Sequence, residues 1–251
     1  MPTIPTKKLA IAIPTYNESE NIPKLIGSIR RAIDKIPNIA CTILIIDDNS
    51  PDGTSKIAKE LSKKNKSKNF QIKVMDRTIK EGLGKAYIDG FKFLLDEKKY
   101  DLILQMDADL SHDPNDITKF IKASETADFI VGSRYINGGS TPDWTPLRKI
   151  LSRGGNIYAS LILGTKIHDY TGGYNLYSVK LLNRIDLNKL QASGYGFLIE
   201  LKFTAMKYAN TITEIPIIFI DRQHGSSKLP KNTIVSNLLL VPQIKLKAKK
   251  D

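Results

Sequence analysis

Residues 105–114 read QMDADLSHDP and place two carboxylates, Asp107 and Asp109, directly after an apolar run. Side chains two positions apart in an extended chain lie on the same face, so the pattern predicts two anions that point the same way. Anions held that close repel each other unless a positive charge lies between them. Carboxylate oxygens are hard ligands that suit Mg²⁺ or Mn²⁺, which predicts a divalent metal site. The competing interpretation is a loop that leads into a helix at Pro114.

Apolar runs alternate with amphipathic segments along the first half of the chain. Strands are expected over residues 8–13, 41–46, 70–75, 101–106 and 128–133, and helices within residues 19–36, 47–61, 82–95 and 114–124. Continuous apolar strands that alternate with amphipathic helices indicate a mostly parallel sheet flanked by helices, which is an α/β fold. A length of 251 residues allows one such domain, or a domain with an appendage.

Polar clusters follow several of the expected strands. PTYNE follows the first strand, DDNSPDGT the second, DADLSHD a later one, and GSRY another. Ligands of parallel α/β sheets bind at the carboxyl ends of the strands. We therefore expect these clusters to form a single site.

The formal net charge of +12 favours anionic partners such as nucleotides, phospholipid surfaces or nucleic acid. The single cysteine, Cys41, excludes a disulfide framework and is expected to be a buried thiol. No stretch reaches the roughly 18 apolar residues that span a bilayer, and the N-terminal residues lack the features of a signal peptide. The expected location is cytoplasmic, either soluble or peripheral on a membrane.

Seven segments then occur in one order, namely IPTYNESENI, IIDDNSPDGT, GLGKAY, MDADLSHDP, VGSRY, DYTGGYNLYS and DRQHGSSKL. Together they resemble the family-2 glycosyltransferases of the GT-A fold, and more closely the dolichyl-phosphate (polyprenyl-phosphate) mannosyltransferases. The resemblance runs from about Leu9 to Leu229. It implies a GT-A catalytic domain over residues 1–229 and a short amphipathic, basic segment over residues 230–251 without a transmembrane helix.

The resemblance also implies roles for individual residues. Pro14, Tyr16 and Glu18 would hold the base and ribose end of a sugar nucleotide, and Ile46 and Asp48 would contribute to base recognition. Asp107, Ala108 and Asp109 would hold the diphosphate and an Mg²⁺ or Mn²⁺ ion bound by the two aspartates. The catalytic set comprises Asp109 together with three cations near the diphosphate and the acceptor phosphate, namely Arg134, Arg222 and Lys228. Ser111 stands where some relatives carry a metal-binding Gln, and it is not counted as a ligand.

The implied reaction is inverting transfer of mannose from GDP-mannose to a polyprenyl (dolichyl) phosphate. A lipid phosphate is already anionic, so a general base is not required, and the three histidines are expected to be structural. One alternative is transfer of glucose from UDP-glucose to the same lipid. A nucleic-acid-binding module, suggested by a pI near 9.5, is disfavoured because the lysines do not interleave with aromatic residues. A nucleotidyltransferase would need a Gly-rich basic loop after the first strand, where this chain has PTYNE.

Two segments have the composition of membrane-surface helices. Residues 147–163 carry an apolar helical stripe, for which the alternative is an ordinary core helix, and residues 232–250 end a short apolar run in lysines. The resemblance implies interface helices at both places. We therefore expect the protein on the cytoplasmic face of a membrane, bound directly or through a membrane-anchoring partner subunit.

Overall fold

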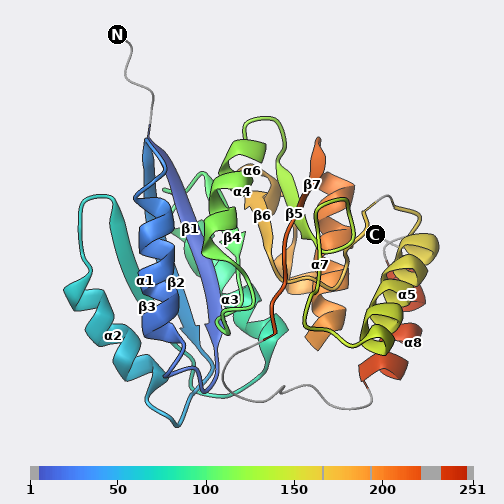
Figure 1. Ribbon diagram of the computed structural model, residues 1–251, viewed down its shortest axis with the longest axis horizontal. Coiled ribbons are helices and arrows are strands. Elements are labelled where there is room, and N and C mark those ends of the chain that lie inside the picture. Colours follow the sequence, from blue (N-terminus) through green and yellow to red (C-terminus); the bar gives the residue numbers. More distant parts are fainter. Residues whose placement is uncertain (1–5, 166, 193, 222–232, 248–251) are drawn as a thin grey trace.

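The computed structural model describes residues 6–165, 167–192, 194–221 and 233–247. Among these residues a seven-stranded sheet has the order β3-β2-β1-β4-β6-β5-β7 (Figure 1). Its strands are β1 (Lys7–Thr15), β2 (Ile39–Asp47), β3 (Phe70–Asp76), β4 (Leu102–Gln105), β5 (Phe129–Ser133), β6 (Asn175–Ser178) and β7 (Ile212–Pro216). Strand β6 runs antiparallel to both of its neighbours, and the other pairings are parallel. The expected mostly parallel α/β fold is confirmed.

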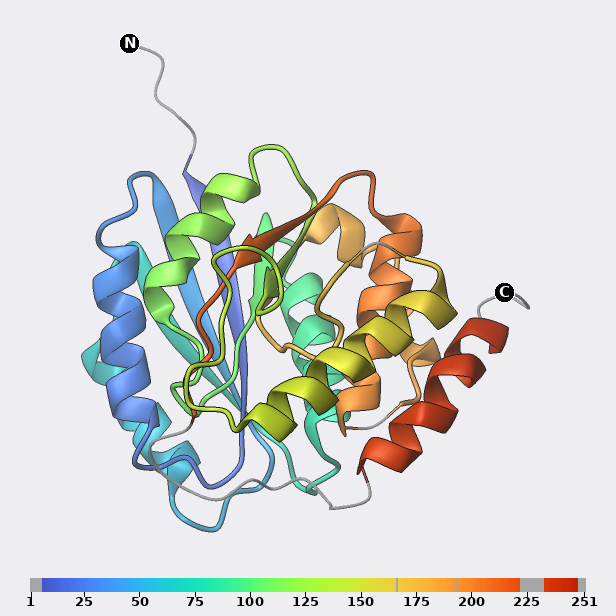
Figure 2. The same cartoon turned by 45° about the vertical axis from the view of Figure 1, so that its right-hand side comes forward.

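Helices cover both faces of the sheet. One apolar core joins the sheet to α1 (Ile22–Ile33), α2 (Thr54–Lys64) and α4 (Ile117–Ala123), and the 3-10 turn η1 (Pro114–Asp116) lies against α1. The other joins it to α3 (Leu83–Asp96), α5 (Pro146–Leu163), α6 (Val179–Leu182), the 3-10 turn η2 (Leu187–Lys189), α7 (Gly194–Tyr208) and α8 (Thr233–Lys247). Figure 2 shows α5, α7 and α8 together at one side of the molecule, away from α1 and α2.

The five expected strands and the helices between them are confirmed with small shifts at their ends. Strands β6 and β7 have no counterpart among the expected strands. The four residues of β6 are too few to show a period of their own, and the strand depends on side-chain bonds to β4. The Asn175 amide and the Tyr177 hydroxyl donate to Oε1 of Gln105 at 3.0 and 3.1 Å.

Side chains in the first half of the chain are closely packed in the interior. Cys41 is buried as expected, and burial raises the pKa of its thiol. Helix α3 approaches β2 so closely that a Cβ at Gly90 would lie 2.3 Å from Cδ1 of Ile46.

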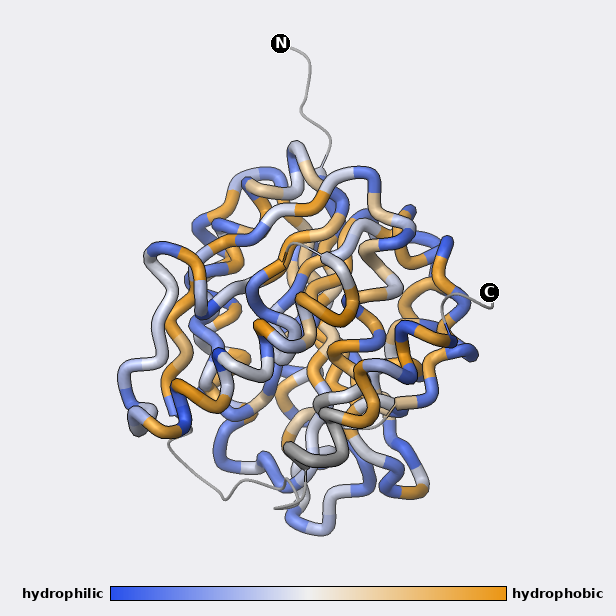
Figure 3. The backbone as a smooth tube through the Cα atoms, turned by 90° about the vertical axis from the view of Figure 1, so that its right-hand side faces the viewer, coloured by the Kyte–Doolittle hydropathy of each residue, from blue (hydrophilic) through white to orange (hydrophobic). Residues whose placement is uncertain are grey.

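Figure 3 turns the side with α5 and α8 toward the viewer, and its apolar orange segments alternate there with polar blue ones.

The C-terminal helix α8 packs against α5 and α7. Val241 and Ile244 of α8 are buried in the core shared with those helices. The predicted domain boundary after Leu229 lies outside the described residues, so it stays a prediction. No described helix is long and apolar enough to cross a membrane.

Candidate active site

The two aspartates of the DAD motif follow β4, but not on an extended strand. Strand β4 ends at Gln105, and the chain bends through residues 108–110 with a left-handed Leu110 (φ 65°). The Asp109 carboxylate turns back to accept the backbone N–H of Ser111 at 3.1 Å. The predicted extended conformation at Asp107 and Asp109 is therefore wrong. The Asp107 side chain is 33% exposed, whereas Asp109 is buried.

Three groups bracket Asp107. The Tyr87 hydroxyl donates weakly to its Oδ1 at 3.4 Å, and the ring of His112 lies with Nε2 3.8 Å from its Oδ2. A Cβ at Gly173 would lie only 2.9 Å from Oδ1. A residue with a side chain at position 173 would therefore displace the carboxylate, so glycine at this position allows the Asp107 carboxylate to lie close to the backbone.

His112, one of the residues beside the Asp107 carboxylate, is buried. Its ring stacks on Tyr174 with centroids 4.6 Å apart and meets Phe219 edge-on. Burial lowers the pKa of His112 to about 4, a shift that the nearby Asp109 carboxylate only partly opposes. The imidazole is therefore neutral at physiological pH.

The donor set suits a divalent cation that is shared with a phosphate. Asp107 and Asp109 supply hard oxygen ligands, and the Asp107 side chain is partly exposed. Among the described residues no three His, Cys, Asp or Glu side chains converge into a complete cage. Mg²⁺ characteristically binds to one or two carboxylates and takes its other ligands from phosphates and water. The two aspartates fit that mode and do not fit an all-protein cage.

A buried Arg–Asp pair lies at the next strand ends. Asp48, which follows β2, pairs with Nη1 of Arg77, which follows β3. Asp48 also accepts the backbone N–H of Gly82 at 2.9 Å, which ties the Gly-rich entry of α3 to β2. Arg77 further contacts Glu81 at 2.5 Å and Asp89 at 3.1 Å. Arg77 is not among the predicted site residues. Its position directly after a strand, where ligands of such sheets bind, could have identified it.

The other residues predicted to contact the base and ribose of a sugar nucleotide lie near β1 and β2. Glu18 is buried, and its carboxylate accepts the Asn21 amide at 2.7 Å. The Lys80 ammonium lies 3.5 Å from the centroid of the half-buried Tyr16 ring. The Ile46 side chain is fully buried, so this residue can reach a ligand only through its backbone. Pro14 is half-buried at the end of β1.

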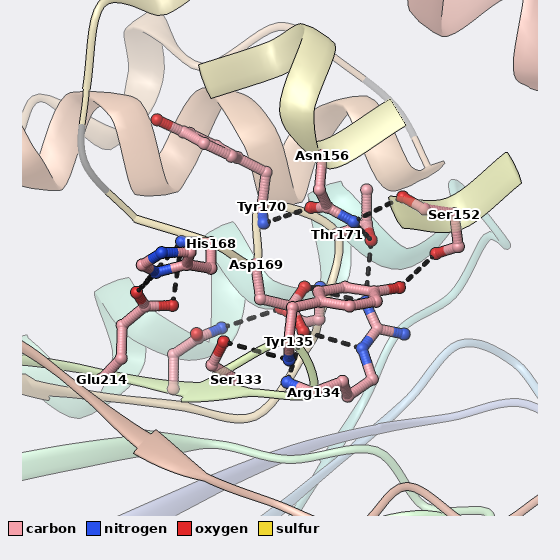
Figure 4. Close-up of polar contacts among 12 residues, drawn as sticks. Ser133, Arg134, Tyr135, Ser152, Asn156, His168, Asp169, Tyr170, Thr171 and Glu214 are labelled. Carbon is pink, nitrogen blue, oxygen red and sulfur yellow. Dashed lines mark hydrogen bonds and ion pairs between the residues drawn. The ribbon is translucent and has the colours of Figure 1, made fainter. Parts of the chain in front are cut away.

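Arg134 forms the second buried ion pair of the site (Figure 4). Its Nε and Nη2 donate to the two oxygens of Asp169 at 2.7 and 2.8 Å, and Nη2 also reaches the Thr171 hydroxyl. Asp169 in turn accepts the Gly172 N–H at 2.9 Å, so the pair holds the turn that leads to Gly173. Burial raises the pKa of Asp169, but the Arg134 guanidinium outweighs that effect and holds this pKa well below its usual range.

Lys202 of α7 is a second buried cation close to Asp169. It is fully buried, and its Nζ donates to the Asp169 carbonyl at 2.6 Å. Burial lowers the pKa of Lys202 to about 8. Asp169 belongs to the DYTGGYN segment, which the sequence already marks, whereas nothing in the sequence distinguishes Lys202 from the other lysines.

The predicted cations Arg222 and Lys228 lie outside the described residues. Immediately before them, Asp221 accepts the Trp144 indole at 3.0 Å and the Arg148 guanidinium at 2.9 Å. Trp144 precedes α5, and Arg148 belongs to its first turn. These contacts join the start of α5 to the chain that leads into the predicted phosphate-binding segment.

Most of the predicted apolar stripe on α5 is exposed, whereas its members Tyr158 and Ile162 are partly buried and pack against the core. Leu147, Ile150, Leu151, Ile157 and Leu161 are each at least 50% exposed, and the buried residues of this helix are Asn156, Ala159 and Leu163. Most of the stripe therefore faces away from the core, while the opposite side of α5 packs against it. Leu239 and Leu246 of the adjacent α8 are exposed as well.

Comparison with known proteins places these features in a family. The model described as glycosyl transferase family 2 matches residues 10–186. Polyprenol monophosphomannose synthase of Mycolicibacterium smegmatis is 37% identical over 248 residues, which cover 98% of this chain and 90% of that protein. Undecaprenyl-phosphate mannosyltransferase of Micrococcus luteus is 39% identical over 217 residues, which cover 86% and 85%.

Solved structures share the fold at much lower identity. Mannosyl-3-phosphoglycerate synthase from Rubrobacter xylanophilus aligns with a TM-score of 0.68 at 14% identity, over 97% of this chain and 74% of that one. Glucosyl-3-phosphoglycerate synthase from Mycobacterium tuberculosis, in complex with Mn²⁺, UDP-glucose and phosphoglyceric acid, aligns with a TM-score of 0.64 at 16% identity. That alignment covers 96% of this chain and 79% of the other.

Proposed function

The chain belongs to glycosyl transferase family 2 and has the GT-A fold, and on that premise we propose that it transfers mannose from GDP-mannose to a polyprenyl phosphate with inversion. The observation that carries the proposal is the row of polar groups at the carboxyl edge of the sheet, where Asp48 follows β2 and Asp107 follows β4, the two strands on either side of β1. The two curated relatives, both of which are named for mannose and polyprenol chemistry, support the choice of sugar and acceptor.

The donor nucleotide is proposed to bind over β1 and β2. Pro14, Tyr16 and Glu18 contact the base and ribose, and Asp48 and the backbone of Ile46 recognise the base. The buried carboxylates of Glu18 and Asp48 support this arrangement, because the N–H and O–H groups of a nucleoside need acceptors.

The diphosphate is proposed to bind at Asp107, Ala108 and Asp109. A Mg²⁺ or Mn²⁺ ion held by the two aspartates would stabilise the charge of the departing nucleoside diphosphate. The exposure of the Asp107 carboxylate supports the assignment. Ser111 is buried, and its N–H binds Asp109, which suits a loop-forming residue better than a metal ligand.

The acceptor phosphate is proposed to attack C1 of mannose directly. The new C1–O bond forms as the bond from C1 to the GDP oxygen breaks, and its electron pair leaves with GDP. A phosphate oxygen that is already anionic needs no base, and Arg222 and Lys228 supply the compensating charge. Arg134 stands near this end of the site, but its bidentate pairing with Asp169 suits positioning of the 169–173 turn better than a direct phosphate contact.

The exposed face of α5, together with α8, is proposed to lie on the cytoplasmic surface of a membrane. Five exposed aliphatic side chains on α5 occur with the exposed cations Arg148, Lys149 and Arg153, a composition that suits an anionic lipid surface. The chain would reach the lipid acceptor by direct binding, with or without an anchoring subunit. Residues 1–229 would form the catalytic unit and residues 230–251 would add to this surface.

Product analysis tests the proposed reaction. Purified protein receives labelled GDP-mannose or UDP-glucose, a short polyprenyl phosphate, and Mn²⁺ or Mg²⁺. We expect mannosyl lipid from GDP-mannose only, and loss of turnover in Asp109→Asn. Asp96→Asn, an exposed carboxylate at the far end of α3, is the matched control and should keep parental turnover. Glucosyl lipid from UDP-glucose would replace the donor assignment, and parental turnover in Asp109→Asn would refute the metal site.

Vesicle sedimentation tests the membrane surface separately. Removing two large exposed apolar groups in the double variant Ile150→Ser/Leu161→Ser should weaken binding to anionic vesicles at least tenfold, since burial of each side chain is worth about 1.5–3 kcal/mol. Ile79→Ser is the control, because Ile79 is 66% exposed but lies in the loop before α3. Equal binding by all three proteins would show that α5 does not contact the lipid.

A further inference from the structure

His112 is held rigidly next to the aspartate that stands at the centre of the proposed diphosphate site. The residue is 1% exposed, and its ring lies between Tyr174 and Phe219. The stacked contact with Tyr174 has an interplanar angle of 12°, and the contact with Phe219 is edge-on at 73°. These contacts fix the plane of the imidazole, so its two nitrogens point in defined directions.

The hydrogen bond at Nδ1 decides which nitrogen carries the proton. The backbone N–H of Asp107 donates to Nδ1 of His112 at 3.1 Å. A ring nitrogen that accepts a hydrogen bond has no proton, so the neutral ring is protonated at Nε2. His112 is thus a hydrogen-bond donor at Nε2.

That donor has no hydrogen-bond partner within the described part of the chain. Its nearest acidic group is the Asp107 carboxylate, with 3.8 Å between Nε2 and Oδ2, which exceeds hydrogen-bond length. Buried donors are almost always paired, and an unpaired one therefore indicates a partner that arrives or moves. A small rotation of the Asp107 side chain would bring Oδ2 within reach.

We propose that His112 is a positioning residue for the diphosphate site: its Nε2–H donates to the Asp107 carboxylate and holds it in the orientation that binds a divalent cation. The inference rests on the proposed function, because it requires Asp107 to be a metal ligand. Metal-binding carboxylates are commonly hydrogen-bonded by a surrounding shell. The orientation of each carboxylate has a larger effect on metal binding where the described protein ligands are only two carboxylates.

Three substitutions separate this role from simple packing. His112→Asn keeps an acceptor near the position of Nδ1 for the Asp107 N–H but removes the donor at Nε2. His112→Gln has the longer side chain that can place an amide donor near Nε2. His112→Phe keeps the aromatic stack on Tyr174 and removes both polar groups. His168→Asn is the control, because His168 is exposed and pairs with Glu214.

The measurement is the affinity of the full chain for Mn²⁺ in the presence of GDP, followed by the electron paramagnetic resonance of free Mn²⁺ well below the unfolding temperature. We expect His112→Asn and His112→Phe to bind Mn²⁺ about 10-fold to 100-fold more weakly. His112→Gln should recover most of the loss, and His168→Asn should match the parent. Recovery by Gln is a result that a merely structural role would not produce.

Two results would overturn the inference, and they are distinguishable. Parental Mn²⁺ affinity in His112→Asn would show that His112 only packs, while leaving the metal site itself intact. A parent chain that binds no Mn²⁺ with GDP would remove the metal site of the proposed function, and this role of His112 with it.

Discussion

Two buried Arg–Asp pairs flank the site, and they differ in how their charges are balanced. The side chains of Arg77 and Asp48 are each 6% exposed, and those of Arg134 and Asp169 are 5% and 0% exposed. In the first pair one guanidinium contacts three carboxylates, because Glu81 and Asp89 also bind Arg77. In the second pair one carboxylate has two buried cations near it, because Arg134 binds the Asp169 carboxylate and Lys202 binds the Asp169 backbone carbonyl.

The two ends of the site therefore differ in the sign of their excess charge. The surplus of carboxylates around Arg77 lies at the end where a nucleoside would present N–H and O–H donors. The surplus of cations around Asp169 lies at the end where an anionic acceptor would approach. An otherwise similar ion pair can thus bias its surroundings toward either sign, according to the third and fourth charges packed around it.

Breaking the second pair should have the largest effect. Asp169→Asn keeps the size of the side chain but leaves Arg134 buried without its carboxylate partner and removes one of the anions near Lys202. Removing one partner of a buried pair costs about 3–5 kcal/mol, and we expect a loss near the upper end because both cations are affected. Urea unfolding monitored by circular dichroism measures it. A loss below about 1 kcal/mol would mean that water enters and solvates the pair.

Breaking the first pair should cost less. Arg77→Met leaves Asp48 buried, but the Gly82 and Glu81 N–H groups still reach its carboxylate. We expect a loss of about 3 kcal/mol in the same unfolding experiment, together with weaker binding of GDP. Arg30→Met, which removes an exposed guanidinium paired with Asp34, serves as the control. If both variants lost the same stability, the Arg77 cluster would be no more than a surface network.

The pH dependence of stability should identify Lys202. Its pKa falls from 10.5 to about 8 on folding, so between about pH 8 and 10.5 the unfolded chain holds the proton that the folded chain has lost. Stability due to Lys202 therefore rises with pH through that window, by roughly 3 kcal/mol in total. The parent minus Lys202→Met difference in unfolding free energy isolates this term. A difference that is independent of pH would contradict the lowered pKa.

The smallest effect should come from an exposed partner of Arg77. The Glu81 side chain is 50% exposed, and such ion pairs contribute about 0–1 kcal/mol. Glu81→Gln should therefore lower the unfolding free energy by less than about 1 kcal/mol, and by less still in 1 M salt. A loss as large as that of Arg77→Met would show that Glu81, and not Asp48, is the main partner of Arg77.

Much of the fold follows from local pattern alone. The buried strands β1 to β5 and the helices between them are predictable because continuous apolar runs and helical periodicity leave few alternatives. The same pattern indicates that DAD, DDNSPDGT and PTYNE gather at one edge, since parallel strands bring their carboxyl ends together. The apolar stripe of α5 is also legible in the sequence, but whether it faces the core or the solvent is not.

Contacts between distant segments decided the rest. The antiparallel β6, the pairing of Arg134 with Asp169, and the burial of Lys202 depend on contacts between residues 33 to 72 positions apart, which no local period encodes. A bend replaces the expected extended chain at Asp109, where the Ser111 N–H binds the Asp109 carboxylate and Leu110 adopts a left-handed conformation that is unfavourable for leucine. The sequence by itself determined which residue types line the site. Only the tertiary structure decided which of their charges are already compensated, because the desolvation and pairing that govern a buried charge come from neighbours in space.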